Sequence, residues 1–496
     1  MPLCLFLLLV SLILCFGDFI DDIYNLTYFS SSRSPGVVKR AALLTPYGLT
    51  PGGGERYFLT SALALQKLGY AIDLILFADN ICQTHNCIHD TLISLRIPLE
   101  PHSFQIRVIP KSYDFSLEIV GKSISERHYE VFYLIGNGKF PTFLPIGQFN
   151  IYMCQFPFDV NAEKAVAMFN YHHYFPNFVK FDQIIVNSRF THNWYMRAVS
   201  TALLRHFKSE ATYSPTLTIL HPPVESFITD NSATEVVSPP PRSEVTNIVV
   251  CGRLFLGRQN KGHDIAIDIF KDVVAQAKTP VHLYLMGYVH PDLASHQYIQ
   301  DLRHNASASN LPVSFLPNAR SDEIFQTLGK STILWHLTGV RYLEAPNEDP
   351  ASFEHFGIAI VEAMYSGCIP IVTHIGGPTD IITHKHNGFL ASSINEYVTH
   401  TLALLETPEA EVQRIQRNAQ RTAKSFSTTI FIEKLQAITI RGVRMHALRE
   451  QARLGESMLL TPTQVRCVCV CVCALRGWIQ SLSHILLYIC ILYLCI

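Results

Sequence analysis

The sequence predicts an α/β fold built from two Rossmann-like domains in tandem. Short apolar runs alternate with stretches of helical periodicity over residues 37–220, and the same alternation returns over residues 247–405. This alternation is typical of parallel sheets with helices on both faces. A polar stretch with three consecutive prolines at 239–241 separates the two sets and indicates a linker, assigned to residues 226–246.

Composition agrees with a large folded enzyme or binding protein. The 496 residues are 48% hydrophobic and 16% charged, which excludes disorder for most of the chain. The 39 basic and 40 acidic residues give a net charge of -1, so a nucleic-acid partner is not expected. The 13 cysteines are too sparse for a disulfide scaffold, although Cys82 and Cys87 are spaced to pair in an oxidising compartment.

Each domain has a predicted order of elements. In the first domain, residues 37–225, the expected strands are 37–45, 71–77, 105–109, 131–135, 151–154, 183–187 and 216–220, with a helix over 56–68. In the second domain, residues 247–425, the expected strands are 247–251, 281–286, 313–316, 332–335 and 369–373, with helices over 263–276, 322–328, 358–365 and 394–405. A closing helix is expected over residues 426–449. Ligands of such sheets bind at the carboxyl ends of the strands, so the cleft between the domains is the expected site.

The two ends differ from the middle. Residues 1–17 form a short apolar run, which is interpreted as a signal peptide or short anchor, or alternatively as a wrongly assigned first exon. The tail, residues 450–496, alternates Val and Cys over 467–473 and ends in twelve apolar residues. Twelve residues are short for a membrane span, so a tail anchor and an artefact of translated repeat DNA both remain open.

Three features in the middle of the chain indicate a site for an anionic ligand. The first is the glycine run that contains Gly53 and Gly54, placed between a strand and a helix, where the backbone can approach a phosphate. The second is the pair Arg253 and Lys261, which follow a strand and precede a helix and suit a diphosphate. The usual P-loop and dinucleotide motifs fail, and no Asp-x-Asp pair is present to hold a metal diphosphate, so no metal site is predicted.

The third feature is a pair of carboxylates, Glu354 and Glu362. Eight helical steps of about 100° would leave them roughly 80° apart at the start of one helix. Glu362 lies in an otherwise apolar run, and a buried carboxylate is costly without hydrogen-bond donors, which ligand hydroxyls would supply. The backbone amides of Phe356 and Gly357 would open the helix toward a phosphate.

These residues resemble the retaining GT-B glycosyltransferases of glycosyltransferase family four, whose fold is two Rossmann-like domains facing across a cleft. The matching motifs run in family order over about residues 38–440. They are Pro51-Gly-Gly-Gly-Glu55, Asn187-Ser-Arg-Phe-Thr191, His221-Pro-Pro-Val224, Cys251-Gly-Arg253 with Lys261-Gly262, Trp335-His-Leu-Thr-Gly339, Glu354 to Glu362, and Gly376-Gly-Pro378.

The resemblance implies a role for each matched residue. Arg253 and Lys261 would hold the donor diphosphate and stabilise the departing nucleotide without a metal, and Glu354 would meet the donor sugar. The other positions with an implied donor-binding role are Gly53, Gly54, Phe356, Gly357, Ile358 and Glu362. Many relatives carry a histidine on the acceptor side where this chain has Gln155, which can hydrogen-bond a sugar but cannot act as a general base.

The implied function is transfer of a sugar from a GDP- or UDP-linked donor to a glycan or lipid-linked acceptor with retention of configuration, and no other cofactor is expected. The motifs around residues 46–56 and 354–358 resemble the eukaryotic α-1,2-mannosyltransferase of lipid-linked oligosaccharide assembly, whereas 335–339 resembles bacterial polysaccharide transferases. The expected setting is a membrane-associated place in the endomembrane system, with the cytoplasm as the alternative. A non-catalytic nucleotide- or carbohydrate-binding protein and a glycogen-synthase-like or phosphorylase-like enzyme are the competing interpretations.

Overall fold

The computed structural model describes residues 38–457, apart from the segments listed next. These segments are residues 51, 78–79, 81, 101–102, 110–128, 138–144, 157–177, 208–215, 225–243, 258 and 344–349. The N-terminal apolar run, most of the expected linker and the Val-Cys tail therefore lie outside the described residues. The chain divides into two compact units, Met1–Gln436 and Ala437–Ile496.

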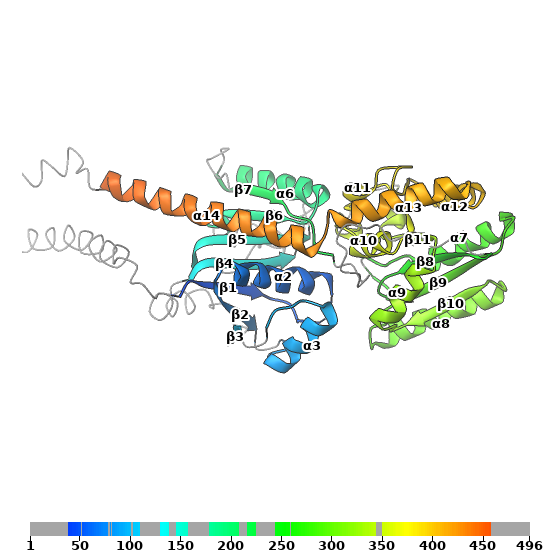
Figure 1. The fold of residues 1–496 in the computed structure, drawn as a ribbon, viewed down its shortest axis with the longest axis horizontal. Coiled ribbons are helices and arrows are strands. Elements are labelled where there is room, and N and C mark those ends of the chain that lie inside the picture. The colour runs from blue at the N-terminus through cyan, green and yellow to red at the C-terminus, as the bar shows by residue number, and fades with distance from the viewer. Residues whose placement is uncertain are drawn as a thin grey trace, which may run out of the picture. The chain divides into compact units, whose positions relative to one another are not determined.

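Within the described part of the chain, the first domain contains a seven-stranded parallel sheet with the order β3-β2-β1-β4-β5-β6-β7 (Figure 1). Its strands are β1 (Arg40–Thr45), β2 (Ala71–Phe77), β3 (Phe104–Ile109), β4 (Tyr129–Asn137), β5 (Gly147–Phe156), β6 (Gln183–Val186) and β7 (Thr216–Ile219). The strand order reverses between β1 and β4, and ligands of open parallel sheets bind at such a switch point.

Among the described residues of this domain, the long helices are α2 (Gly53–Lys67), α3 (His85–Leu95) and α6 (Arg189–Phe207). Helix α2 begins at Gly53, three residues earlier than expected, because Gly52 is extended and Glu55 adds a negative charge to the first turn. The glycine run is therefore the first turn of the helix rather than a loop before it. Cys82 and Cys87 form a disulfide beside the start of α3.

The second domain contains, among the described residues, a six-stranded parallel sheet with the order β10-β9-β8-β11-β12-β13. Its strands are β8 (Thr246–Cys251), β9 (Val281–Gly287), β10 (Val313–Pro317), β11 (Ile333–His336), β12 (Ile369–Thr373) and β13 (Phe389–Ala391). The switch point lies between β8 and β11. The prediction missed β13, which has only three residues and hence no readable period.

The helices of this domain are α7 (His263–Gln276), α8 (Leu293–Ala308), α9 (Ser321–Gly329), α10 (Ile358–Tyr365), α11 (Pro378–Ile381), α12 (Ile394–Glu406) and α13 (Glu409–Lys424), with 3₁₀ turns η1 (Val340–Tyr342) and η2 (Pro350–Ser352). Helices α7 and α10 have the predicted bounds. The prediction missed α13 because its apolar face is narrow: Val412, Ile415, Ala419 and Ala423 are buried in an otherwise charged sequence.

Alternate residues of the second sheet pack on opposite faces. Ile248 and Val250 of β8 belong to one buried cluster, whereas Val249 belongs to another with Met364. Since both faces are covered, the strands read as continuous apolar runs, as parallel sheets require. The expected α/β fold with two Rossmann-like domains is confirmed.

The chain returns to the first domain after α13. The amide of Val224 donates to the carbonyl of Phe426 at 2.9 Å, and the Phe431 ring meets Tyr57 edge to face at 4.8 Å. Residues 426–436 therefore close the first domain, as expected for the start of the closing helix. Helix α14 runs from Thr428 to Ser457 and continues into the second unit. Among the helices of the described chain, none has the length and apolar character needed to cross a bilayer.

Asp73 on β2 gives a first test of this fold. Its carboxylate is fully buried and bound by Arg40 at 2.5 Å, Arg107 at 2.7 Å and Tyr129 at 2.6 Å. Burial alone would raise the pKa of Asp73, but these partners outweigh it and lower the pKa. The stabilisation is therefore present above the unfolded pKa of about 3.9 and is lost as the pH falls through the lower folded pKa.

We expect Asp73→Asn to reduce the free energy of unfolding by about 1.5–3 kcal/mol at pH 7, because charged hydrogen bonds are lost. Urea denaturation at pH 7 and at pH 3 checks this, since the gap between the two proteins should narrow at the lower pH. If the difference in the free energy of unfolding between the wild type and Asp73→Asn is the same at both pH values, the charge of Asp73 is not the source of the stabilisation.

Candidate functional site

Glu354 lies at the centre of a polar cluster at the switch point of the second sheet. One oxygen of its carboxylate accepts a hydrogen bond from Lys261 Nζ at 2.8 Å and lies 3.1 Å from His336 Nε2. Lys261 follows β8 and His336 ends β11, the two strands between which the sheet order reverses. The loop after one strand and the end of its neighbour therefore converge on a single carboxylate.

This cluster keeps Glu354 ionised. Burial alone would raise the pKa of Glu354, but the Lys261 ammonium and the His336 imidazole outweigh it and hold the pKa well below its usual range. The side chains of Lys261 and Glu354 are 16% and 15% exposed, so a ligand can still contact both. An ionised, partly accessible carboxylate is a strong acceptor for the hydroxyl groups of a sugar.

Glu354 is not part of the helix that follows it, so the expected helical relation between Glu354 and Glu362 is wrong. Helix α10 begins only at Ile358, after Gly357, whose φ of 107° is left-handed and therefore suits glycine. Phe356 is buried against the rings of His221 and Phe426. The side chain of Phe356 thus anchors the turn, while the amides at the start of α10 are the groups left to bind an anion.

Glu362, one turn into α10, has a partner that the sequence did not suggest. Arg56 of α2 places a guanidinium nitrogen 3.7 Å from Glu362 Oε1, and the two side chains are only 10% and 17% exposed. Burial raises the pKa of Glu362, and the charge of Arg56 offsets part of that rise. The two domains therefore meet here through an ion pair.

Arg253 and Lys261 are brought to the same place. The stem of Lys261 packs against Gly252, the neighbour of Arg253 in sequence. Arg253 is exposed and its guanidinium lies 5.2 Å from the centre of the Phe255 ring. Burial raises the pKa of Glu55, whereas its backbone amide and the charge of Arg253 lower it. Arg253 thus acts electrostatically on the start of α2.

The two glycines of the first turn of α2 contact different parts of the site. A Cβ atom on Gly53 would lie 2.7 Å from Ile358 Cδ1, at the start of α10. A Cβ atom on Gly54 would lie 2.6 Å from Gln155 Nε2. The structure therefore assembles all the predicted site residues around the start of α2 and the start of α10, with Gln155 on the side of the first sheet.

A cavity of about 570 Å³ is present in the second domain, and none of the predicted site residues lines it. It is lined by segments that follow β8 and β11, including Asn260, Asp264, Arg341 and Tyr342. Over the residues that the structure describes, no group of three or more His, Cys, Asp and Glu side chains is placed to hold a metal ion. The cation in contact with Glu354 is the Lys261 ammonium.

Sequence reasoning missed two members of this site, Arg56 and His336. His336 ends a buried strand at the carboxyl edge of the sheet, a position that favours ligand contact and that could have singled it out. Arg56 gave no such signal, because it reads as one charged residue in an amphipathic helix until the two domains are placed together.

Two parallel-sheet α/β domains in tandem are typical of the GT-B fold, and comparison with solved structures agrees. A glycosyltransferase from Rickettsia africae ESF-5 matches 82% of this chain and 99% of its own with a TM-score of 0.57 and 15% identity. Anabaena Alr3699/HepE, solved in complex with UDP and glucose, matches 81% of this chain and 99% of its own with a TM-score of 0.51 and 17% identity.

Residues 238–422 match the family model described as Glycosyl transferases group 1. The GDP-Man:Man(3)GlcNAc(2)-PP-Dol alpha-1,2-mannosyltransferase of Dictyostelium discoideum is 32% identical over 152 residues, which are 30% of this chain and 27% of that protein. The Alpha-1,3/1,6-mannosyltransferase ALG2 of Mus musculus is 24% identical over 51% of this chain and 57% of its own. The chain thus matches about a quarter to just over half of the length of these relatives.

Gly377 offers a test of how tightly the site is packed. A Cβ atom at this position would overlap the carbonyl oxygen of His355 and the Cα of Phe356, both backbone atoms that cannot move aside easily. We expect Gly377→Ala to lower the free energy of unfolding by about 1–3 kcal/mol or more through overpacking.

Gly329→Ala is the matched control, because a Cβ atom there meets nothing within 4 Å and Gly329 ends helix α9. Its stability should be unchanged or raised by up to about 1 kcal/mol. Thermal or urea unfolding measures the stability of both variants. An equal change in the free energy of unfolding in Gly377→Ala and Gly329→Ala would contradict the close approach of residues 376–377 to the loop that contains Glu354.

Proposed function

We propose that this chain is a retaining, metal-independent glycosyltransferase that uses a nucleotide-sugar donor. The observation that carries the proposal is the ionised carboxylate of Glu354, held by Lys261 and His336 directly before the start of α10. The proposed site would combine a carboxylate for sugar hydroxyls, two cations for a diphosphate and the first amides of helix α10.

The residues suggest how the reaction would be divided among them. As the bond between the sugar and the diphosphate breaks, negative charge grows on the diphosphate oxygen, and Lys261 and Arg253 would stabilise it in place of a metal. A hydroxyl of the acceptor forms the new bond on the same face of the sugar. Gln155 cannot take the acceptor proton, so that proton would pass to the departing diphosphate.

Glu362 would bind the ribose of the donor. Its only ion-pair partner among the described residues is Arg56, at 3.7 Å, which leaves oxygen lone pairs of Glu362 to accept hydrogen bonds from the ribose hydroxyls. The nucleotide-sugar would be the only cofactor-like ligand, because the cations already on the protein complement the diphosphate.

The relatives support a choice of donor and acceptor without deciding it. The name of the Dictyostelium protein specifies GDP-Man and a PP-Dol-linked acceptor. We therefore propose a GDP- or UDP-linked sugar as donor, GDP-mannose first, and a glycan or lipid-linked acceptor. A lipid-linked acceptor would place the enzyme at an endomembrane surface, with a cytoplasmic glycan acceptor as the alternative.

A thermal-shift screen with UDP, GDP and their sugars, followed by turnover with a panel of acceptors, tests this function. Stabilisation by one nucleotide and its sugar, with release of that nucleotide when an acceptor is added, is the expected result. Binding without any turnover on any acceptor would favour the non-catalytic alternative.

The cationic pair gives a prediction for binding. We expect Lys261→Ala and Arg253→Ala each to weaken binding of GDP or UDP by about 1.5–3 kcal/mol, since a charged hydrogen bond to the diphosphate is lost. Isothermal titration measures this. Lys278→Ala, at an exposed lysine paired with Glu406, is the matched control and should leave nucleotide affinity unchanged.

Glu354 gives a prediction for turnover. Glu354→Gln keeps the size of the side chain but removes its charge, so we expect turnover to fall by about 100-fold or more while affinity for the free nucleotide changes little. Glu411→Gln, at an exposed carboxylate paired with Arg414, should keep full activity. Wild-type activity should persist in EDTA, and its loss with recovery on adding manganese would refute the metal-independent chemistry.

A further inference from the structure

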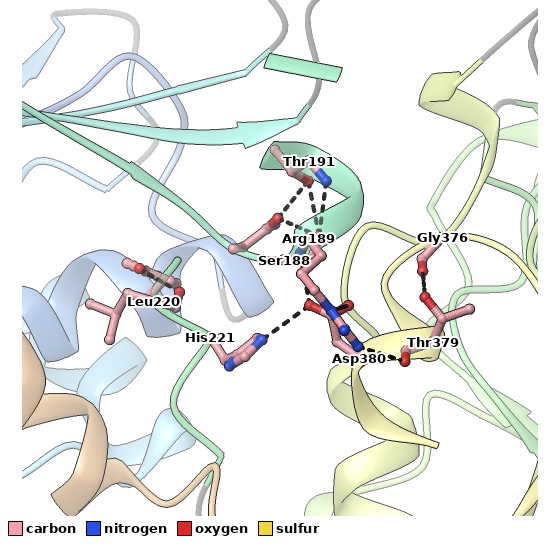
Figure 2. A network of polar contacts seen from close by, with 10 residues as sticks. Ser188, Arg189, Thr191, Leu220, His221, Gly376, Thr379 and Asp380 are labelled. Carbon is pink, nitrogen blue, oxygen red and sulfur yellow. Dashed lines mark hydrogen bonds and ion pairs between the residues drawn. The ribbon is translucent and has the colours of Figure 1, made fainter. Parts of the chain in front are cut away.

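Asp380 lies on the short helix α11 of the second domain, yet its partners lie on the first domain. Its side chain is only 2% exposed. Figure 2 shows it between the start of α6 and His221, two segments of the first domain that are over thirty residues apart in sequence. Three sequence motifs that the proposed chemistry does not use, around residues 187–191, 221–224 and 376–378, therefore meet at one carboxylate.

The contacts of Asp380 with α6 are those of a helix cap. Arg189, the first residue of α6, donates its backbone amide to Asp380 Oδ2 at 2.7 Å and its Nε to Oδ1 at 2.9 Å. Ser188 accepts the amide of Thr191 at 3.1 Å, as an ordinary N-cap does. The first amides of a helix lack partners within it, and a negative charge is favourable there. The second domain thus supplies part of the cap of a helix in the first.

His221 completes the contact from the other side. Its Nε2 lies 3.2 Å from Asp380 Oδ2, and its ring packs against Phe356 at 5.4 Å. A buried carboxylate is costly unless it is paired. Because the described side chains that bind Asp380 belong to the first domain, the carboxylate is satisfied only while the two domains keep this alignment.

The same turn is tied to the donor loop. The amide of Asp380 donates to the carbonyl of Gly377 at 2.9 Å, and the amide of Gly377 donates to the carbonyl of Glu354 at 2.7 Å. Gly377 also approaches His355 too closely to admit a Cβ atom. A short chain of backbone contacts therefore joins the start of α6 to the residue that holds the donor sugar.

We propose that Asp380 is a positioning residue, which sets the first domain, and with it the acceptor, relative to Glu354 by capping α6 across the domain junction. This role rests on the proposed glycosyl transfer. The described side-chain partners of Asp380 are Arg189 and His221, and neither is a proposed donor residue. Loss of Asp380 should therefore disturb the geometry of transfer more than the binding of the nucleotide.

The test uses Asp380→Asn in the full chain, with Asp73→Asn as the matched control. Asp73 is an equally buried aspartate bound by two arginines, but it lies inside the first domain and away from the junction. We expect turnover of GDP-mannose or UDP-glucose, whichever the wild type uses, to fall about 10- to 100-fold for Asp380→Asn, since small misplacements have effects of that size. The KM for that donor and the affinity for free GDP or UDP should stay within about twofold.

Amide hydrogen exchange gives a second readout that does not depend on activity. Exchange at residues 189–191 should become about 10-fold faster in Asp380→Asn, because a charged hydrogen bond to the first turn of α6 is weakened. Asp73→Asn should lose stability without either effect. Combining Arg189→Ala with Asp380→Asn should lower turnover no further than Asp380→Asn alone.

Unchanged turnover in Asp380→Asn, an equal loss in Asp73→Asn, or a loss of nucleotide affinity as large as the loss of turnover would each overturn the positioning role. If amide hydrogen exchange at residues 189–191 is unchanged in Asp380→Asn, Asp380 does not cap α6. If the wild-type chain turns over no donor, the proposed function is wrong. The hydrogen-exchange experiment would then still test whether Asp380 caps α6.

Discussion

The site depends on one constraint, which is that the carboxylate of Glu354 must be ionised where little water reaches it. Burial would neutralise it, and only the approach of Lys261 and His336 prevents this. Those two residues can meet Glu354 because β8 and β11 are neighbours in the second sheet, although more than 80 residues separate them in sequence. The left-handed Gly357 then ends the loop and starts α10 at once, so that helix amides face the same corner. The ionised state of Glu354 therefore depends on the order of the strands as well as on the charges beside it.

The first domain joins this arrangement through contacts that its helix α2 makes with residues of the second domain. Gly53 lets the first turn of α2 approach Ile358, and Arg56 pairs with Glu362 at a distance that a ligand could lengthen or replace. Arg253 in turn acts on Glu55. Charges on each domain thus face opposite charges on the other, while the donor residues Lys261, His336 and Glu354 lie within one domain.

Much of this could be predicted from sequence, and the failures have physical causes. Helices α7 and α10 had their predicted bounds because apolar spacing and a flanking glycine agree there. The placement of Glu354 on a helix was wrong because a spacing of eight residues says nothing about where the helix begins, and Gly357 begins it late. Arg56 and Asp380 were missed because their partners lie on the other domain. A charged residue that serves the junction between two domains looks like an ordinary surface charge until both are folded.

The two domains contribute different kinds of residues to the proposed site. The family match covers residues 238–422, the part that holds Arg253, Lys261, His336, Glu354 and Glu362. Under the proposed function, these residues would face a diphosphate and a sugar, whose chemistry leaves little freedom in where cations and carboxylates stand. The acceptor side would present Gln155 from the first domain, and a neutral amide imposes no single charge on the acceptor. We therefore expect the first domain, and the way its alignment is held, to decide the acceptor, and the second domain to decide the class of donor.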